Sequence, residues 1–218
     1  MKKTALIVAG GSGKRFKTTT PKQFLKIKNK PVLMHTIEKF AHLDNIILVL
    51  PKAHINKWND FCKINSFNIN HELVEGGKSR FESVKNGLNY ITDTDIILIH
   101  DGVRPFVSKK TINLLIKSVS DNIGVVPVIP ITESIRYIEK DKSQAIIREN
   151  YFKVQTPQCF KFNDILEAYN QKFKKKFTDD ASVFEALNKK IIPIEGEIEN
   201  IKITYPIDLY IAEKLLAQ

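Results

Sequence analysis

The chain has 218 residues, 43% of them hydrophobic, and a formal net charge of +10. That length suits one globular domain, and the excess of basic residues favours anionic partners: nucleic acid, an acidic membrane surface or phosphorylated small molecules. Lysines are spread along the whole chain, without a basic stripe interleaved with aromatic residues, which disfavours nucleic acid. No apolar run approaches the ~20 residues that a membrane-spanning helix needs, so we expect no membrane partner.

The N-terminal stretch MKKTALIVAGG has a basic start and a short apolar run, as a signal peptide does. The run is too short for the apolar region of a signal peptide and leads into glycines rather than a cleavage site. Residues 4–9 are therefore predicted to form the first strand. The two cysteines, Cys62 and Cys159, lack the spacing of a metal-binding or redox pair, which indicates a reducing compartment. We expect a cytoplasmic protein.

Short apolar runs then alternate with helical patterns along the chain. The runs predict strands at 5–9, 46–50, 72–74, 96–100 and 124–128. Apolar residues at helical spacing predict helices at 31–43, 79–91 and 108–119, the last with Ser108 as its N-cap. The C-terminal part predicts helices at 162–173 and 179–188, a strand near 200–204 and a last helix from Pro206. Strands that are apolar almost throughout are typical of sheets covered on both faces. The predicted fold class is α/β, with a mainly parallel, Rossmann-like sheet flanked by helices.

Residues 131–155 interrupt this alternation. Two short β-prone runs flank the polar centre EKDKSQ, which predicts a β-hairpin arm projecting from a single domain that spans residues 1–218. A lone hairpin is only marginally stable in water, and this one carries the apolar side chains of Ile135, Tyr137 and Ile146. We therefore expect the arm to pack against a second subunit.

The segment LIVAGGSGKRFKTTTPKQF, residues 6–24, combines glycines with basic residues in a loop-like stretch. A Walker A loop would need glycine in place of Val8 and a hydroxyl in place of Arg15, and a dinucleotide fingerprint would need glycine in place of Phe16. What remains is a glycine turn after a strand, with Arg15 and Lys22 on either side of a short polar segment. Ligands of open α/β sheets bind at the carboxyl ends of strands. The loop is either an anion-binding turn of this kind or a turn with solvated basic residues.

Three further stretches carry candidate site residues. In EGGKSRFESV, Gly77 can admit a base or phosphate close to the backbone, while Ser79 is either a ligand contact or a helix N-cap. In IHDGVRPF, Asp101 follows a buried strand and can hold Mg²⁺ or a ribose hydroxyl, or simply stabilise a turn. In ENIKIT, Lys202 either faces solvent from an edge strand or points at an anion.

Taken together and in order, seven stretches resemble the 2-C-methyl-D-erythritol 4-phosphate cytidylyltransferases: AGGSGKRF, PKQFL, GGKSRFESV, HDGVRPF, QTPQCF, TDDASV and ENIKIT. The resemblance runs in register from about residue 5 to the last helix, and seven motifs in one order are specific although each alone is modest. It implies a nucleotidyltransferase that couples CTP to methylerythritol phosphate with Mg²⁺ and releases pyrophosphate, in non-mevalonate isoprenoid synthesis.

The same resemblance implies roles for individual residues. The catalytic contacts to the phosphates would come from Arg15, Lys22 and Lys202. The nucleotide would lie along Ala9, Gly10 and Gly11, with cytosine recognised near Gly77, Lys78 and Ser83. Other members can have Asp where this chain has Lys78, which leaves the role of that side chain open.

The acceptor side is implied in the same way. Asp101 would hold the metal and, with Arg104, contact the substrate. Ser134 and Arg148 on the arm would bind methylerythritol phosphate across the interface of a homodimer. Because the attacking phosphate is already ionised, no histidine needs a catalytic role.

Three other interpretations stay open on the sequence. A ribitol-5-phosphate cytidylyltransferase shares the style of the first, second and fourth motifs, although PVIPITESIR and FTDDASV favour methylerythritol phosphate as the acceptor. A non-enzymatic nucleotide-binding regulator would be expected to lose Arg15, Lys22 or Asp101, all of which are present. An RNA-binding basic protein would carry an RNA-module signature, which this sequence lacks.

Overall fold

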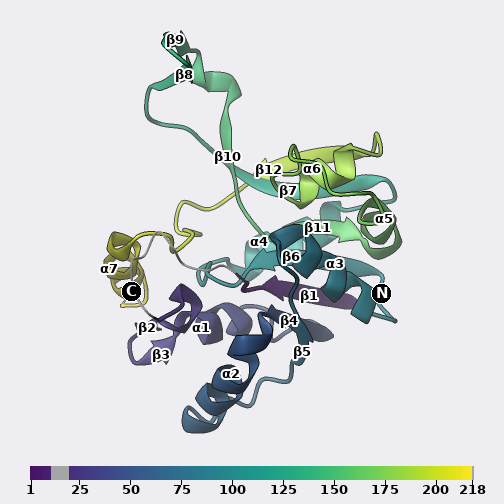
Figure 1. Ribbon diagram of the computed structural model, residues 1–218, viewed down its shortest axis with the longest axis vertical. Coiled ribbons are helices and arrows are strands. Elements are labelled where there is room, and N and C mark those ends of the chain that lie inside the picture. Colours follow the sequence, from purple (N-terminus) through teal and green to yellow (C-terminus); the bar gives the residue numbers. More distant parts are fainter. Residues whose placement is uncertain (11–19, 218) are drawn as a thin grey trace.

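The computed structural model describes residues 1–10 and 20–217 (Figure 1). Within these ranges, eight strands form one sheet with the spatial order β10-β7-β11-β6-β1-β4-β5, and β12 pairs with β7. The strands are β1 (Lys3–Val8), β4 (Asn45–Leu50), β5 (Glu72–Glu75), β6 (Ile96–Asp101), β7 (Ile123–Pro130), β10 (Phe152–Val154), β11 (Gln158–Lys161) and β12 (Lys190–Glu195). Four pairs are parallel: β1–β4, β1–β6, β4–β5 and β7–β12. Strand β10 pairs antiparallel with β7, and β11 pairs antiparallel with both β6 and β7. The predicted α/β class with a mainly parallel sheet is confirmed.

Helices cover both faces of this sheet. Alternate residues of β1 enter two separate cores, Ala5 and Ile7 on one side and Leu6 and Val8 on the other. The first core is closed by α1 (Val32–Glu38), α2 (Lys52–Ile64) and α4 (Lys109–Ser118). The second is closed by α3 (Arg80–Tyr90), α5 (Phe162–Ala168) and α6 (Asp180–Glu185). The continuous apolar character of β1 is thus explained by burial on both faces.

Two elements differ from the sequence-based expectation in the C-terminal part. The strand predicted near 200–204 is wrong: these residues lie outside every strand, and Ile203 donates a single backbone hydrogen bond to the Val103 carbonyl at 2.9 Å. The strand beside β7 is instead β12. Pro193 lies within β12, and it is tolerated there because β12 pairs on one side only, where a missing N–H costs no ladder bond.

The N-terminal half also differs in two places. Helix α2 was not predicted, although Ile55, Trp58 and Phe61 recur at helical spacing and pack on the first core. Helix α1 ends at Glu38, before the end of its predicted range of 31–43. The N-caps were better specified by the sequence: Ser108 Oγ accepts from the backbone N–H of Thr111 at 3.1 Å, as predicted.

The C-terminal helix α7 (Pro206–Leu215) packs against a small hairpin of β2 (Lys26–Ile27) and β3 (Lys30–Pro31). A third, smaller core joins them, formed by Ile27, Val32, Val103, Ile203 and Ala212. Two 3₁₀ helices lie within the described ranges, η2 (Lys22–Phe24) and η3 (Arg148–Asn150). Across the described ranges, no helix has the length and apolar character to cross a membrane.

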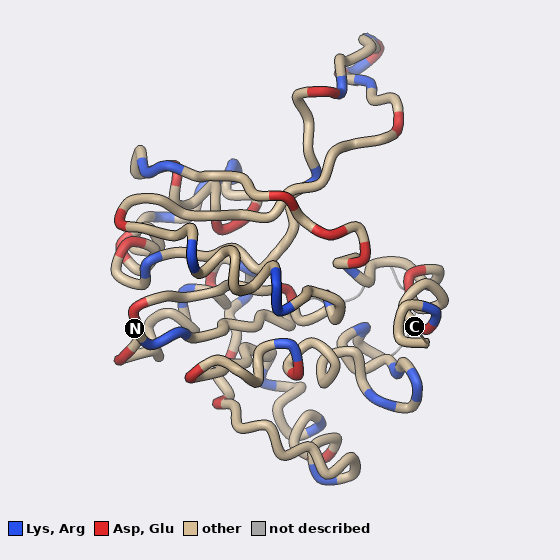
Figure 2. The backbone as a smooth tube through the Cα atoms, turned by 180° about the vertical axis from the view of Figure 1, so that it is seen from behind, with Lys and Arg blue, Asp and Glu red and all other residues tan. Residues whose placement is uncertain are grey.

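The arm is the part of the chain that leaves the body of the molecule (Figure 1). As predicted, it is a two-stranded antiparallel hairpin, formed by β8 (Ile135–Glu139) and β9 (Lys142–Ile146). Its return, β10, pairs with β7 and so belongs to the main sheet. Figure 2 shows Lys and Arg distributed over sheet, helices and arm, with Asp and Glu among them.

Candidate active site

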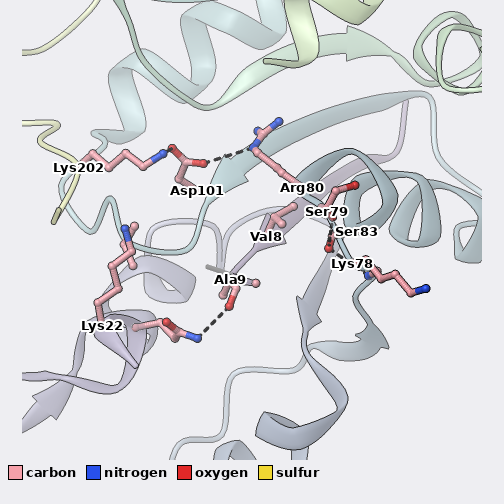
Figure 3. A pocket seen from close by; sticks show the side chains of 13 residues that line it. Val8, Ala9, Lys22, Lys78, Ser79, Arg80, Ser83, Asp101 and Lys202 are labelled. Carbon is pink, nitrogen blue, oxygen red and sulfur yellow. Dashed lines mark hydrogen bonds and ion pairs between the residues drawn. The ribbon is translucent and has the colours of Figure 1, made fainter. Parts of the chain in front are cut away.

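The site lies where the carboxyl ends of neighbouring strands meet. Val8, the last residue of β1, stands beside Asp101 of β6 and beside Val49 of β4 in the sheet register. The chain runs from β1 outward in both directions, so β1 marks the point at which strand order reverses, the usual ligand position in open α/β sheets. A cavity of about 190 Å³ opens there (Figure 3). Its lining residues are Val8, Ala9, Gly10, Lys22, Gln23, Gly77, Lys78, Ser79, Arg80, Ser83, Asp101, Val103 and Lys202.

The glycine turn after β5 forms one wall of this cavity. The backbone N–H of Gly77 donates to Ser83 Oγ at 3.1 Å, and that hydroxyl donates to the Ser79 carbonyl at 2.8 Å. A Cβ atom at Gly77 would lie 2.3 Å from Cβ of Glu82, so only glycine fits this turn. Ser79 is the N-cap of α3, accepting from the Glu82 N–H at 3.1 Å. The buried Ser83 hydroxyl therefore fixes the backbone that faces the cavity.

The end of β1 and the helix η2 form another wall. The Gln23 side-chain amide, almost completely buried, donates to the Ala9 carbonyl at 2.9 Å and holds the end of β1 against η2. This contact also brings the neighbouring Lys22 to the cavity. Lys22 Nζ donates to the Ile203 carbonyl at 3.2 Å, which joins η2 to the segment that carries Lys202.

Asp101 is the acidic side chain in the lining and is surrounded by three cations. Lys202 Nζ lies 2.9 Å and Arg104 Nε 3.3 Å from its Oδ2 atom, and Arg80 Nε lies 3.7 Å from Oδ1 (Figure 3). Burial alone would raise the pKa of Asp101, but Lys202, Arg80 and Arg104 together hold that pKa well below its usual range. Burial lowers the pKa of Arg104, and Asp101 opposes that shift. One carboxylate among several cations leaves the site with an excess of positive charge, which suits anionic ligands.

A buried histidine supports this carboxylate from behind. Thr156 Oγ1 accepts from the Asp101 N–H at 3.1 Å and lies 3.0 Å from Nδ1 of His100, whose Nε2 lies 3.0 Å from the Arg104 carbonyl. Because the Arg104 carbonyl can only accept, Nε2 of His100 donates to it, and the neutral ring accepts at Nδ1 from the Thr156 hydroxyl. His100 thus links the backbones of Asp101 and Arg104 and has a structural role.

Acid should expose this histidine's contribution to stability. Burial lowers the pKa of His100 from 6.5 to about 4, so between these values the unfolded chain binds the proton that the folded chain excludes. The free energy of unfolding should therefore fall as pH drops from 6.5 to 4, by up to about 3 kcal/mol from this group. Urea unfolding of the wild type and His100→Asn at pH 7 and pH 4.5 measures it. Between these two pH values, His100→Asn should lose less free energy of unfolding than the wild type. His42→Asn, at an exposed histidine, should lose nearly as much as the wild type. Equal slopes in wild type and His100→Asn would contradict the assignment.

Most of the sequence-predicted site residues come together at this cavity. Of the residues described, Ala9, Gly10, Lys22, Gly77, Lys78, Ser83, Asp101 and Lys202 line it, and Arg104 contacts Asp101 directly. Gly11 and Arg15 lie outside the described residues. The Lys78 side chain points away from the pair of Asp101 and Lys202 (Figure 3). Ser134 and Arg148 are absent from the lining: both are exposed on the arm, where the Arg148 guanidinium donates to the Thr132 carbonyl.

Sequence reasoning missed Arg80 and Gln23 as lining residues. Arg80 is the more consequential, because it places a further cation beside Asp101. A basic residue at the first position of a helix that follows a glycine turn was the available signal, since cations are disfavoured near a helix N-terminus unless an acidic partner compensates.

A glycine-walled, cation-rich cavity at the strand-order reversal of a parallel sheet defines a nucleotide-binding α/β transferase of the nucleotidyltransferase class. The model of the family described as "IspD: 2-C-methyl-D-erythritol 4-phosphate cytidylyltransferase" matches residues 4–218. The chain belongs to this family.

Individual relatives agree with that assignment over their full length. The chain is 44% identical to the 2-C-methyl-D-erythritol 4-phosphate cytidylyltransferase of Phocaeicola vulgatus, covering 99% of this chain and 100% of the relative. It is 46% identical to the protein of the same name from Porphyromonas gingivalis, covering 99% and 98%. The crystal structure of the Thermus thermophilus cytidylyltransferase superposes with a TM-score of 0.82 at 27% identity, covering 100% of both chains.

Proposed function

We propose that this chain transfers the cytidylyl group of CTP to 2-C-methyl-D-erythritol 4-phosphate and releases pyrophosphate, in isoprenoid precursor synthesis. The observation that carries the proposal is the family match over residues 4–218 in a chain whose glycine turns and cations converge on one cavity. The names of the relatives favour methylerythritol phosphate over ribitol 5-phosphate as the acceptor.

The reaction is an in-line attack of the acceptor's phosphate oxygen on the α-phosphorus of CTP, with pyrophosphate as the leaving group. Both reactants are anions, so the protein's work is to hold them together and to neutralise their charge. The backbone at Ala9, Gly10 and Gly77 would lie along the nucleotide, close enough because a Cβ atom is absent or directed elsewhere. Lys22 and Lys202 supply mobile point charges to the phosphates. No general base is needed, since the attacking phosphate is ionised.

Two further residues complete the nucleotide side of the proposal. Arg15 would join Lys22 in stabilising the transition state, and Gly11 would continue the turn along the nucleotide. Ser83 would act by holding Gly77, because its hydroxyl already engages Gly77 and the Ser79 carbonyl. Lys78 would contribute its backbone to cytosine recognition, which agrees with a side chain that points away from Asp101 (Figure 3).

Mg²⁺ belongs to the same proposal, with Asp101 as its protein ligand. Mg²⁺ prefers oxygen ligands and is commonly held by one or two carboxylates together with substrate phosphates. The described residues include no cluster of three His, Cys, Asp or Glu side chains, so the phosphates would supply the remaining ligands. When bound, the ion would neutralise phosphate charge; Arg104 and Lys202 would keep the Asp101 carboxylate ionised and oriented toward it.

Two statements concern the setting of the enzyme. We propose that residues 1–218 act as a single nucleotidyltransferase domain, because one sheet carries both cores. We also propose that it works in the cytoplasm. Cys62 and Cys159 are free thiols, which supports a reducing compartment.

A homodimer formed through the arm, residues 131–155, completes the proposal. The arm exposes Tyr137, Ile138 and Ile147, the last at 74% of its surface. A two-stranded hairpin of this kind is marginally stable alone, so a partner surface is expected to cover it. Ser134 and Arg148 are exposed and do not line the cavity of their own subunit, which supports their serving the cavity of a second copy. Sedimentation showing a fully active monomer would overturn this part.

Removing the arm's arginine should weaken acceptor binding selectively. Arg148→Ala is expected to raise the KM for methylerythritol phosphate about 10- to 100-fold, the loss of one charge-assisted hydrogen bond, with the KM for CTP unchanged. Steady-state kinetics with each substrate varied in turn measures both constants.

The matched control for this variant lies on the same arm. Arg136 is exposed and donates to Ser143 across the hairpin, so Arg136→Ala removes an arm arginine without touching the predicted acceptor contacts. It should leave both KM values near wild type. An Arg148→Ala enzyme with weakened CTP binding and an unchanged KM for the acceptor would count against the arm as the acceptor site.

The decisive test of the function is an assay with two acceptors. Purified protein, CTP and Mg²⁺ are incubated with either methylerythritol phosphate or ribitol 5-phosphate, and pyrophosphate release is followed. We expect turnover with the former. Turnover with ribitol 5-phosphate alone would show a different acceptor, and nucleotide binding without pyrophosphate release from either acceptor would indicate a regulator.

A further inference from the structure

Arg80 is held from behind by a carboxylate that is remote in sequence. Its Nη1 and Nη2 atoms donate to Oδ1 and Oδ2 of Asp180, each at 2.7 Å, so the guanidinium binds the carboxylate in a bidentate manner. Asp180 is the first residue of α6 and is fully buried. Its charge lies in the interior, yet the arginine it binds lines the cavity.

A tyrosine completes this support. Tyr169, 1% exposed, donates its hydroxyl to Asp180 Oδ1 at 2.6 Å. Its ring stacks on Phe81, the residue after Arg80, with 4.8 Å between ring centroids. Oδ1 of Asp180 therefore receives two hydrogen bonds and Oδ2 receives one. The carboxylate orientation, and with it the plane of the guanidinium, is fixed by groups on three elements of the second core.

The front edge of Arg80 is held less tightly. Its Nε atom lies 3.7 Å from Asp101 Oδ1, longer than a hydrogen bond. Nη1 and Nη2 of Arg80 each use one N–H group to bind Asp180. The other N–H groups of the guanidinium can therefore donate to an oxygen atom in the cavity. Burial alone would lower the pKa of Arg80, but Asp180 raises it well above its usual value, so the side chain stays charged.

We propose that Asp180 and Tyr169 are positioning residues of the reaction, which hold Arg80 with its free donors directed at a phosphate oxygen of a bound substrate. This inference rests on the proposed function of the same site. A tie between α3 and α6 alone does not require a charge: well-packed apolar residues often replace a buried ion pair without loss of stability. Here Arg80, one member of the buried pair, lines the cavity next to the Asp101 carboxylate, where a cation in a fixed position can bind an anionic substrate. The phosphate belongs either to the nucleotide or to the acceptor.

The sharpest variant is Tyr169→Phe, which removes one hydroxyl and keeps the stacking on Phe81. Loosening the hold on Arg80 is expected to lower kcat about 10-fold, since small misplacements of an oriented group cost one to two orders of magnitude. Tyr210→Phe, at an exposed tyrosine of α7, is the matched control and should keep the wild-type kcat. Asp180→Asn should have a larger effect in the same direction, and urea unfolding shows whether it remains folded.

A double-mutant cycle separates positioning from structural support. If Tyr169 acts through Arg80, Tyr169→Phe should lower kcat by less than twofold in an Arg80→Lys background, where the bidentate contact with Asp180 is already lost.

Titration calorimetry of each variant with CTP alone and with methylerythritol phosphate alone identifies the phosphate, because only the ligand that Arg80 contacts should bind more weakly. Tyr169→Phe with wild-type kcat and wild-type affinity for both ligands, and a changed free energy of unfolding, would overturn the inference. A wild type that releases no pyrophosphate, with Tyr169→Phe still weakening CTP binding, would refute the proposed function and leave the positioning role supported.

Discussion

Replacing Lys22 by alanine is expected to lower kcat by about 10²- to 10³-fold, the usual cost of losing one preorganised charge at a transition state. Lys22 lines the cavity and donates to the carbonyl of Ile203, the neighbour of Lys202. Its charge is needed most when negative charge builds up between the attacking and leaving phosphates. Pyrophosphate release at saturating CTP and acceptor measures the loss. The same result is expected for Arg15→Ala.

The control for Lys22→Ala is Lys26→Ala, four residues further on. Lys26 is exposed on β2, so its removal changes the net charge equally without touching the cavity. It should leave kcat within about twofold of wild type, as surface substitutions away from special features have small effects. A Lys22→Ala enzyme that keeps its kcat would remove Lys22 from the catalytic residues.

Asp101→Asn should reduce both activity and stability. The variant leaves the charges of Lys202, Arg104 and Arg80 facing one another without the carboxylate between them. Breaking a buried charge pair in this way costs about 3 kcal/mol or more, which for a chain of this size lowers Tm on the order of 10 °C. Turnover should fall at least as far as in Lys22→Ala, because both the proposed metal ligand and the orientation of Lys202 are lost.

The pH of the Asp101→Asn measurement follows from the direction of the pKa shift. The pKa of Asp101 is held below its ordinary value of 3.8, so its contribution to stability is fully present above that value and is lost only as pH falls below it. Thermal unfolding at pH 7 therefore shows the whole effect. Asp60→Asn, at an exposed carboxylate of α2, should leave Tm unchanged. An Asp101→Asn protein with the wild-type Tm would show that the three cations do not depend on this carboxylate.

The sequence was most informative where local chemistry decides the structure. The apolar run of β1 correctly predicted burial on both faces. The position of Asp101 after five apolar or aromatic residues correctly predicted that it lies at the end of a strand. Ser79 and Ser108 were recognisable as caps because a cap depends on hydrogen bonds three residues away. Such features need no knowledge of the rest of the chain.

What escaped sequence reasoning depends on distant partners. Arg80 and Asp180 are 100 residues apart, and neither shows in its own surroundings that the other will neutralise it. Strand β12 was not predicted, and it becomes evident only through its pairing with β7. The segment around Lys202 looked like a strand because its isoleucines are apolar, whereas Ile203 is buried against α7 in the third core.

The contact between Lys202 and Asp101 also orders events in the life of the chain. Strands β1, β4, β5 and β6 have all been synthesised by residue 101, and these four are neighbours in the sheet. The cation closest to Asp101 arrives only with residue 202. A nascent chain can therefore assemble the centre of its sheet while Asp101 still lacks its principal counter-charge. Of the three cations beside Asp101, Lys202 is the last to be synthesised, 98 residues after Arg104.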